Sequence, residues 1–291
     1  MKTKTKTFRV PAAWHELRPW QIDRLTKLMT MHGPKYYLDR GRGVMLLALL
    51  ADEKGEPLDE QDCIDVTRNK KNRAALADAA AALDFIKETP PLPLRPETIA
   101  GRRALRADFQ GVRFGTFLRA TGLWSLLLRL YDPADTDLTQ EERIPVIAAA
   151  NGELFDLLYP PVRRKGKEPR PLADEEKQML MAAVVLWMQG LQAMLAGMYP
   201  NLYTAAPTKE KKKKEDDPLH HALAVALGGG DEEETDSDDD PDRTARLMVR
   251  TLTGGDVTKT LAVLRTDTHT CLQEIEERVL ESRKVKASRK A

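Results

Sequence analysis

The chain has 291 residues, with 46 lysines and arginines against 45 aspartates and glutamates, and its formal net charge is +1. This balance argues against a polybasic nucleic-acid coat and against a wholly acidic chain. The total hides an uneven distribution, because residues 231–242 hold nine carboxylates and no basic residue. Removing those nine charges leaves +10 on the rest of the sequence, which is therefore a basic body with one acidic segment.

The first half of the chain predicts helices separated by proline and glycine. Phe8–Pro11 fits either an edge strand or a docked arm. A helix begins at Pro19, where the missing N–H costs nothing, with Trp20, Leu25, Leu28 and Met29 on one face. We expect His32-Gly33-Pro34 to end it.

A second helix is predicted over residues 36–52, whereas residues 58–70 are ambiguous. Alanine-rich residues 72–87 predict a further helix. The proline cluster that follows, residues 89–93, favours an extended strap between helical layers.

Three helices are predicted in the middle of the chain. The first covers residues 113–131, with inward-facing residues Phe114, Phe117, Leu118, Trp124, Leu127 and Leu128. Thr139 and Glu142 have the spacing of a capping box, in which each side chain satisfies the other's backbone N–H, and the helix they start runs towards Tyr159. The third covers Asp174–Gly197 and is rich in Leu, Met and Ala.

Composition changes at residue 204, after which the chain has too little apolar surface to offset the entropy of ordering. We predict a disordered charged linker over 204–242, whose apolar stretch 219–227 docks on a partner or on the body. Asp256 and Asp267 are placed to cap helices in residues 243–291, where Leu272, Ile275 and Val279 follow a helical spacing. The predicted fold is all-α: a helical body at 1–203, the linker, and a small C-terminal helical unit at 243–291.

The predicted compartment is reducing, and no membrane is involved. Cys63 and Cys271 lie far apart, which does not support a disulfide framework or a zinc ribbon. The lysines of the first ten residues are followed by no apolar run, unlike a signal peptide. The longest apolar stretches, residues 44–51 and 179–188, are shorter than the roughly 20 residues that span a bilayer.

Motifs for chemistry are missing from the sequence. It has no phosphate-binding glycine loop, no GxSxG and no HExxH. The acidic segment fails as a calcium loop, because Pro241 and Leu247 stand where glycine and glutamate are required. Cys271 lies close to His269, but we interpret this thiol as a small core residue. We predict no catalytic residue, no metal and no cofactor, and thus no enzyme.

The alternative function is that of a nucleic-acid-associated or regulatory adaptor protein that uses basic clusters. Basic clusters lie at residues 68–73, 163–167 and 283–290. The candidate polyanion-binding residues are Arg163, Arg164, Lys165 and Lys167. No aromatic residue lies within these clusters, so solvated basic loops or helix ends are the favoured interpretation.

Several phrases of the sequence together resemble helical proteins from the tail-morphogenesis region of temperate phages and prophages. They are FRVPAAWHEL at 8–17, FGTFLR at 114–119, LLYPP at 157–161, YPNLY at 199–203, and GDVTK at 255–259 with Val263-Leu264. Proteins from that region are commonly tail-assembly chaperones. The resemblance implies a non-enzymatic, chaperone-like protein in the bacterial host cytoplasm, whose partners are tail proteins such as the tape measure or the tail tube.

Such a chaperone needs an apolar groove for its client, and methionines adapt to varied partners. The long helix at 174–197 carries several methionines. The candidate partner-binding residues are Met181, Met188, Leu191, Leu195 and Tyr199. Ordinary core packing is the alternative for these side chains.

Overall fold

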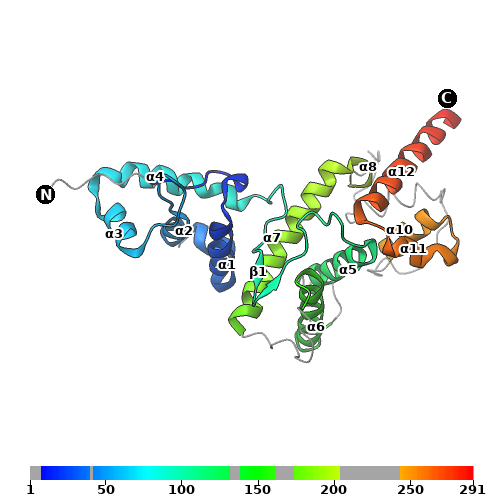
Figure 1. Cartoon of the computed structure of the whole chain (residues 1–291), viewed down its shortest axis with the longest axis horizontal. Coiled ribbons are helices and arrows are strands. Elements are labelled where there is room, and N and C mark those ends of the chain that lie inside the picture. Colours follow the sequence, from blue (N-terminus) through cyan, green and yellow to red (C-terminus); the bar gives the residue numbers. More distant parts are fainter. Residues whose placement is uncertain (1–7, 40–41, 132–137, 162–173, 204–242, 291) are drawn as a thin grey trace. The chain divides into compact units, whose positions relative to one another are not determined.

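A computed structural model describes residues 8–39, 42–131, 138–161, 174–203 and 243–290 (Figure 1). The all-α prediction is confirmed: 72% of the structure is helical, in 11 α-helices. The predicted linker at 204–242, with its apolar stretch 219–227, lies outside the described residues. So does the basic loop at 163–167.

The chain forms two compact units, each made from two separate stretches. Unit 1 combines Met1–Ala104 with Pro161–Ala193, and unit 2 combines Leu105–Pro160 with Met194–Ala291. The prediction set residues 243–291 apart from a body at 1–203. In the structure these C-terminal helices instead share a unit with residues 105–160.

Unit 1 holds the N-terminal helices. Its elements are η1 (Trp14–Glu16), α1 (Pro19–Asp39), α2 (Arg42–Leu49), α3 (Glu60–Arg68), η2 (Lys70–Asn72), α4 (Arg73–Ala82), η3 (Leu83–Lys87), the strands β1 (Thr98–Ile99) and β2 (Arg102–Arg103), and most of α7 (Asp174–Met198). One core cluster joins residues from several of them: Trp14, Leu17, Leu25, Met45, Leu46, Leu49, Leu83, Phe85, Ile86 and Leu186. A smaller cluster of Leu50, Leu58 and Val66 lies under α3.

The N-terminal arm is docked by a single β-bridge. The N–H groups of Arg9 and Ala51 each donate to the other residue's carbonyl oxygen, at 2.9 and 3.0 Å. Of the two predicted alternatives for Phe8–Pro11, the docked arm is therefore the one observed.

The predicted end of the first helix was wrong. The helix continues through Gly33 and Pro34 to Asp39, where a stop was predicted, and α2 is correspondingly shorter than the predicted 36–52. A proline inside a helix costs about 3 kcal/mol. Since α1 packs closely along α2, we attribute the continuation to tertiary packing, which overrides local propensity.

The hairpin β1–β2 was not predicted. Thr98 pairs with Arg103 and Ile99 with Arg102, and the turn between them places Ala100 and Gly101 at φ of 52° and 73°. Positive φ is uncommon for alanine, so the Ala-Gly pair lacks the usual Asn-Gly hairpin signal.

Unit 2 is built on the antiparallel pair α5 (Phe114–Tyr131) and α6 (Gln140–Leu158). Its other elements are the end of α7, α8 (Pro200–Tyr203), α10 (Arg243–Thr253), η5 (Val257–Lys259), α11 (Thr260–Arg265) and α12 (Thr268–Lys290). The C-terminal helices are tied to the start of α5: Phe114 N–H donates to the Thr266 carbonyl at 2.8 Å, and Thr268 Oγ1 donates to the Val112 carbonyl at 2.7 Å. These bonds are the physical reason that the C-terminal helices group with the middle of the chain.

The predicted caps of unit 2 are confirmed. Thr139 and Glu142 form the capping box at the start of α6. Asp256 accepts from Thr258 N–H, and Asp267 accepts from His269 N–H at 2.9 Å. One inward assignment was wrong, because Leu128 is exposed. It lies a quarter turn from buried Leu127, outside the stripe by which α5 packs.

The middle of helix α7 is buried on nearly every side. From Leu180 to Met188, only Met181 and Val185 are more than slightly exposed. The stretch Leu180–Met198 is long and apolar enough, by length and composition alone, to cross a membrane. The apolar run counted from the sequence, residues 179–188, is shorter. In the structure 56% of the longer stretch is buried. We therefore describe α7 as a core helix.

The predicted strap passes directly over α7. A Cβ atom added to Gly190 would lie 2.1 Å from the carbonyl oxygen of Leu92 and 2.7 Å from the Cα of Pro93. Real Cβ atoms do not approach backbone atoms this closely. Glycine at 190 is therefore what lets the proline segment lie against the helix.

We expect Gly190→Ala to lower the free energy of unfolding by about 1–3 kcal/mol, because the strap must move away from α7. The measurement is urea denaturation followed by circular dichroism. Gly197→Ala is the matched control on the same helix, since its Cβ would meet nothing within 4 Å. The control should be neutral or raise stability by up to about 1 kcal/mol, and equal losses in both variants would contradict this account.

Candidate functional site

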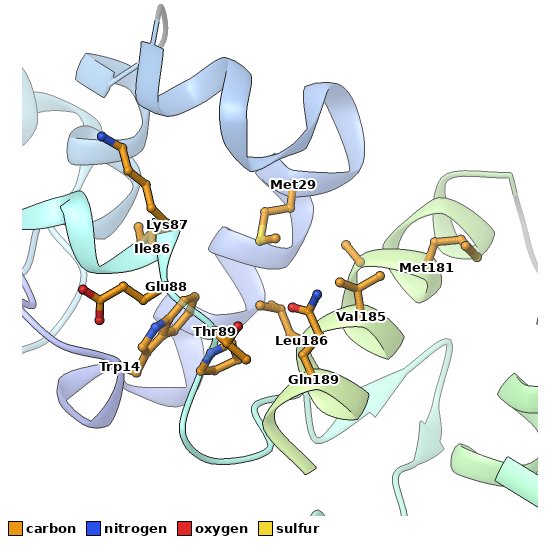
Figure 2. A pocket seen from close by; sticks show the side chains of 12 residues that line it. Trp14, Met29, Ile86, Lys87, Glu88, Thr89, Met181, Val185, Leu186 and Gln189 are labelled. Carbon is orange, nitrogen blue, oxygen red and sulfur yellow. The ribbon is translucent and has the colours of Figure 1, made fainter. Parts of the chain in front are cut away.

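A pocket of about 520 Å³ lies within unit 1, between the end of η3, α1 and the face of α7. Figure 2 shows Met29 of α1 on one side of it and Val185 and Leu186 of α7 on the other. The full lining is Trp14, Met29, Ile86, Lys87, Glu88, Thr89, Pro90, Met181, Ala182, Val185, Leu186 and Gln189. Three stretches far apart in the sequence thus meet at one site.

The walls of the pocket are fixed by the core behind them. The Trp14 ring packs edge-on against Phe85, with centroids 5.2 Å apart and planes at 87°. Trp14, Ile86 and Leu186 are all members of the main core cluster. Met29, Met181 and Val185 are only half-buried, so these apolar side chains are a part of the wall that a ligand would cover.

The polar groups of the pocket lie on Lys87, Glu88, Thr89 and Gln189. Lys87 Nζ is engaged with Asp84 at 3.1 Å. The indole Nε1 of Trp14 is buried and makes no hydrogen bond within the described chain. Among the described residues, no group of three His, Cys, Asp or Glu side chains could hold a metal ion. The arrangement is suited to apolar side chains inside and polar groups at the edge.

The structure places the five predicted groove residues differently from the expectation of one open groove. Met181 lines the pocket. The other four are buried, with at most 7% of the surface of each residue exposed: Met188, Leu191, Leu195 and Tyr199. These four belong to the packed interior, which was the alternative interpretation from the sequence.

The reason lies in the direction of the apolar stripe on α7. The prediction followed a seven-residue spacing from Met181 to Met188, whereas the pocket is lined by Met181, Val185 and Gln189, which are four apart. At 3.6 residues per turn, the lining stripe lies roughly a quarter turn from the predicted one. A spacing of four starting at Met181 was the available signal, but it could not reveal that Trp14 and Met29 lie opposite.

Tyr199 instead joins α8 to α12 in unit 2. Its hydroxyl lies 2.8 Å from Nδ1 of His269, whose Nε2 lies 2.6 Å from the Asp108 carbonyl oxygen. Since a carbonyl can only accept, Nε2 donates to Asp108, and in the neutral imidazole Nδ1 is then the acceptor for the tyrosine hydroxyl. Burial, and then the carboxylates of Asp267 and Glu276, raise the pKa of Tyr199, which keeps this donor protonated.

Cys271 behaves as the core residue that was predicted. Its thiol is buried, and burial, followed by the carboxylates of Asp267 and Glu274, raises its pKa to about 11. The nearby His269 is occupied by Tyr199 and Asp108 through its two ring nitrogens. This geometry does not activate the thiol as a nucleophile.

The predicted polyanion-binding residues Arg163, Arg164, Lys165 and Lys167 lie outside the described residues. Comparison of the chain with models of protein families, with curated proteins and with solved structures finds no match in any of the three.

We expect Tyr199→Phe to lower the free energy of unfolding by about 1–3 kcal/mol, because Nδ1 of His269 loses its partner in a partly buried site. Chemical denaturation at neutral pH measures it. Tyr131→Phe is the control, since the Tyr131 hydroxyl accepts from Asn151 Nδ2 at 3.2 Å on a half-exposed side chain. A loss for Tyr131→Phe as large as that for Tyr199→Phe would refute the role of burial.

The two cysteines should differ in reactivity at pH 8. A thiol with a pKa of about 11 has roughly one molecule in a thousand ionised there, so Cys271 should resist iodoacetamide until the protein unfolds. Cys63 is half-buried and should react first, although burial raises its pKa as well. Mass spectrometry of Cys63→Ser and Cys271→Ser variants, with and without urea, distinguishes the two. Rapid labelling of native Cys271 would be inconsistent with its burial.

Proposed function

We propose that this chain is a non-enzymatic, chaperone-like tail-assembly protein of a phage or prophage, acting in the bacterial host cytoplasm. Its partner is another tail component, for which the tape measure is the first candidate and the tail tube the second. The unit 1 pocket holds apolar side chains of a helical segment of that partner. The proposal rests on the resemblance in the sequence and on the composition of this pocket.

The pocket is the observation that carries the proposal. Helix recognition commonly places the apolar face of an amphipathic helix in a groove, with side chains spaced by three or four residues as anchors. The half-buried Met29 and Val185, together with Met181, supply the variable wall. Unbranched methionine side chains adapt to different apolar shapes, which suits a chaperone that must hold and then release its client.

The edge of the pocket supports release as well as binding. Lys87, Glu88 and Gln189 border the apolar walls, and a polar border surrounding an apolar centre is the usual arrangement of a protein interface. Reversible binding is what assembly requires, because the tail protein must later replace the chaperone on its client.

The proposal predicts a tape-measure gene near the gene for this chain, and the test is co-expression of the two products. We expect a complex that co-purifies and a gain in soluble tape measure. The double variant Met181→Glu, Val185→Glu places two carboxylates at the pocket wall and should weaken the complex at least about 10-fold, because each charge would be desolvated.

Leu261→Glu is the matched control, since Leu261 is a 67% exposed apolar residue on α11 of unit 2 and does not line the pocket. It should leave the complex intact. Circular dichroism of all variants verifies their folding. If the wild-type chain neither binds the tape measure nor increases its solubility, the proposed function is wrong. If Leu261→Glu weakened the complex equally, the pocket would not be the binding site for the tape measure.

A further inference from the structure

Four cations lie together where α3 meets α4 in unit 1. Arg68 ends α3, Lys70 and Lys71 lie in η2, and Arg73 begins α4; we call these four residues the basic turn. All four are exposed. The sequence left this cluster as a solvated loop or a helix end, whereas the structure places it on a defined connection between two helices.

The backbone of the basic turn is held by two asparagines. Asn69 Oδ1 accepts from the Lys71 N–H at 3.1 Å, and buried Asn72 donates from Nδ2 to the Val66 carbonyl at 3.1 Å. Val66 itself belongs to the small core cluster under α3. The four charges are thus presented from a fixed scaffold, which lowers the entropy lost when they bind a ligand.

The basic turn is not ion-paired with a carboxylate within the described part of the chain, although α3 carries Glu60, Asp62 and Asp65 before it. None of its four side chains forms an ion pair there, in contrast to Arg42 with Asp84 and Arg119 with Glu153, both at 2.6 Å. Asp65, one turn before Arg68 on α3, accepts instead from Gln61 Nε2 at 3.0 Å.

The helix dipole gives a second, independent observation. The positive end of a helix is its N-terminus, where anions are favourable and cations are not. The first turn of α4 has no acidic residue, and its N-cap side chain accepts no hydrogen bond from it. Lys70, Lys71 and Arg73 nevertheless lie at this end. The arrangement is unfavourable for α4, although Arg68 suits the C-terminus of α3, and the first turn of α4 has no acidic side chain of its own. An external anion bound here would relieve the cost to α4.

We propose that the basic turn binds the phosphate backbone of a nucleic acid. Four cations within six residues match a ligand with closely repeated charges, and duplex DNA carries one negative charge per roughly 1.7 Å of its axis. The turn has no aromatic residue for base stacking, so its contacts are to phosphates and carry no base sequence information. An acidic protein is less suitable, because residues 68–73 offer no exposed apolar centre for an interface.

The experiment compares the full chain with the variant Arg68→Gln, Lys70→Gln, Lys71→Gln, Arg73→Gln. The probe is a fluorescein-labelled 20-base-pair duplex of mixed sequence, and anisotropy measures binding between 50 and 200 mM NaCl. Each lost phosphate contact reduces the slope of log K against log salt by about 0.9. We expect the variant to lose a slope of up to about 3.6 and to bind at least 10-fold more weakly at 50 mM.

The matched control removes the same number of charges from exposed, separate positions: Lys54→Gln, Arg103→Gln, Arg250→Gln, Arg265→Gln. Its slope of log K against log salt should differ from the wild-type slope by no more than about 0.9, the contribution of one phosphate contact. A thermal melt should show the basic-turn variant close to the wild type in stability, because the removed cations are unfavourable at the N-terminus of α4 but favourable at the C-terminus of α3. The double variant Lys70→Gln, Lys71→Gln should lose a slope of about 1.8, and decides the matter if the quadruple variant does not fold.

Three outcomes would overturn the proposal. The wild-type chain does not bind the duplex at 50 mM NaCl; the control loses as much slope as the basic-turn variant; or polyglutamate of equal charge competes as well as unlabelled DNA. The last outcome would assign the turn to an acidic protein. Each outcome is independent of the tape-measure experiment, because the basic turn and the pocket share no residue.

Discussion

The burial of α7 is the constraint on which unit 1 depends. Between Leu180 and Met188 this helix has no polar side, so it is stable only where other segments cover it in every direction. Leu186 enters the same core cluster as Trp14, Leu25 and Phe85. The proline strap covers another side, at the position where Gly190 leaves no Cβ in the way. A single apolar helix thus fixes where the N-terminal helices, the strap and the pocket can lie.

Unit 1 has two surfaces whose side chains lack full partners, the pocket and the basic turn. At the pocket, Met29 and Val185 remain half-exposed where the rest of the core is closed. At the basic turn, the cations lie at the helix end that would prefer anions. Both arrangements cost stability locally, and both are supported from behind by buried residues, Trp14 in one case and Asn72 in the other. Rigid support under an unsatisfied surface is the pattern expected of a binding site.

The elements with explicit local chemistry were predictable from the sequence. The Thr139–Glu142 box and the caps at Asp256 and Asp267 act within a few residues, so their spacing determines their geometry. Local signals failed where distant packing decides: α1 passes through Pro34, and Ala100 adopts positive φ in a short hairpin. The prediction of the site failed for a related reason. The sequence identified α7 as rich in methionine, but which side of it remains open depends on Trp14 and Met29, more than 150 residues earlier.

The discontinuity of the two units has a consequence for how the chain is made. Unit 1 needs residues up to Ala193, yet Leu105–Pro160, which belong to unit 2, are synthesised before those residues. Domains usually fold from the N-terminus as they leave the ribosome. Here the first 104 residues must wait for α7 while the α5–α6 pair is already available, and that pair in turn waits for the C-terminal helices. Neither unit can be completed by a contiguous fragment, so dividing the chain near residue 104 or residue 160 splits a core rather than releasing a separable module.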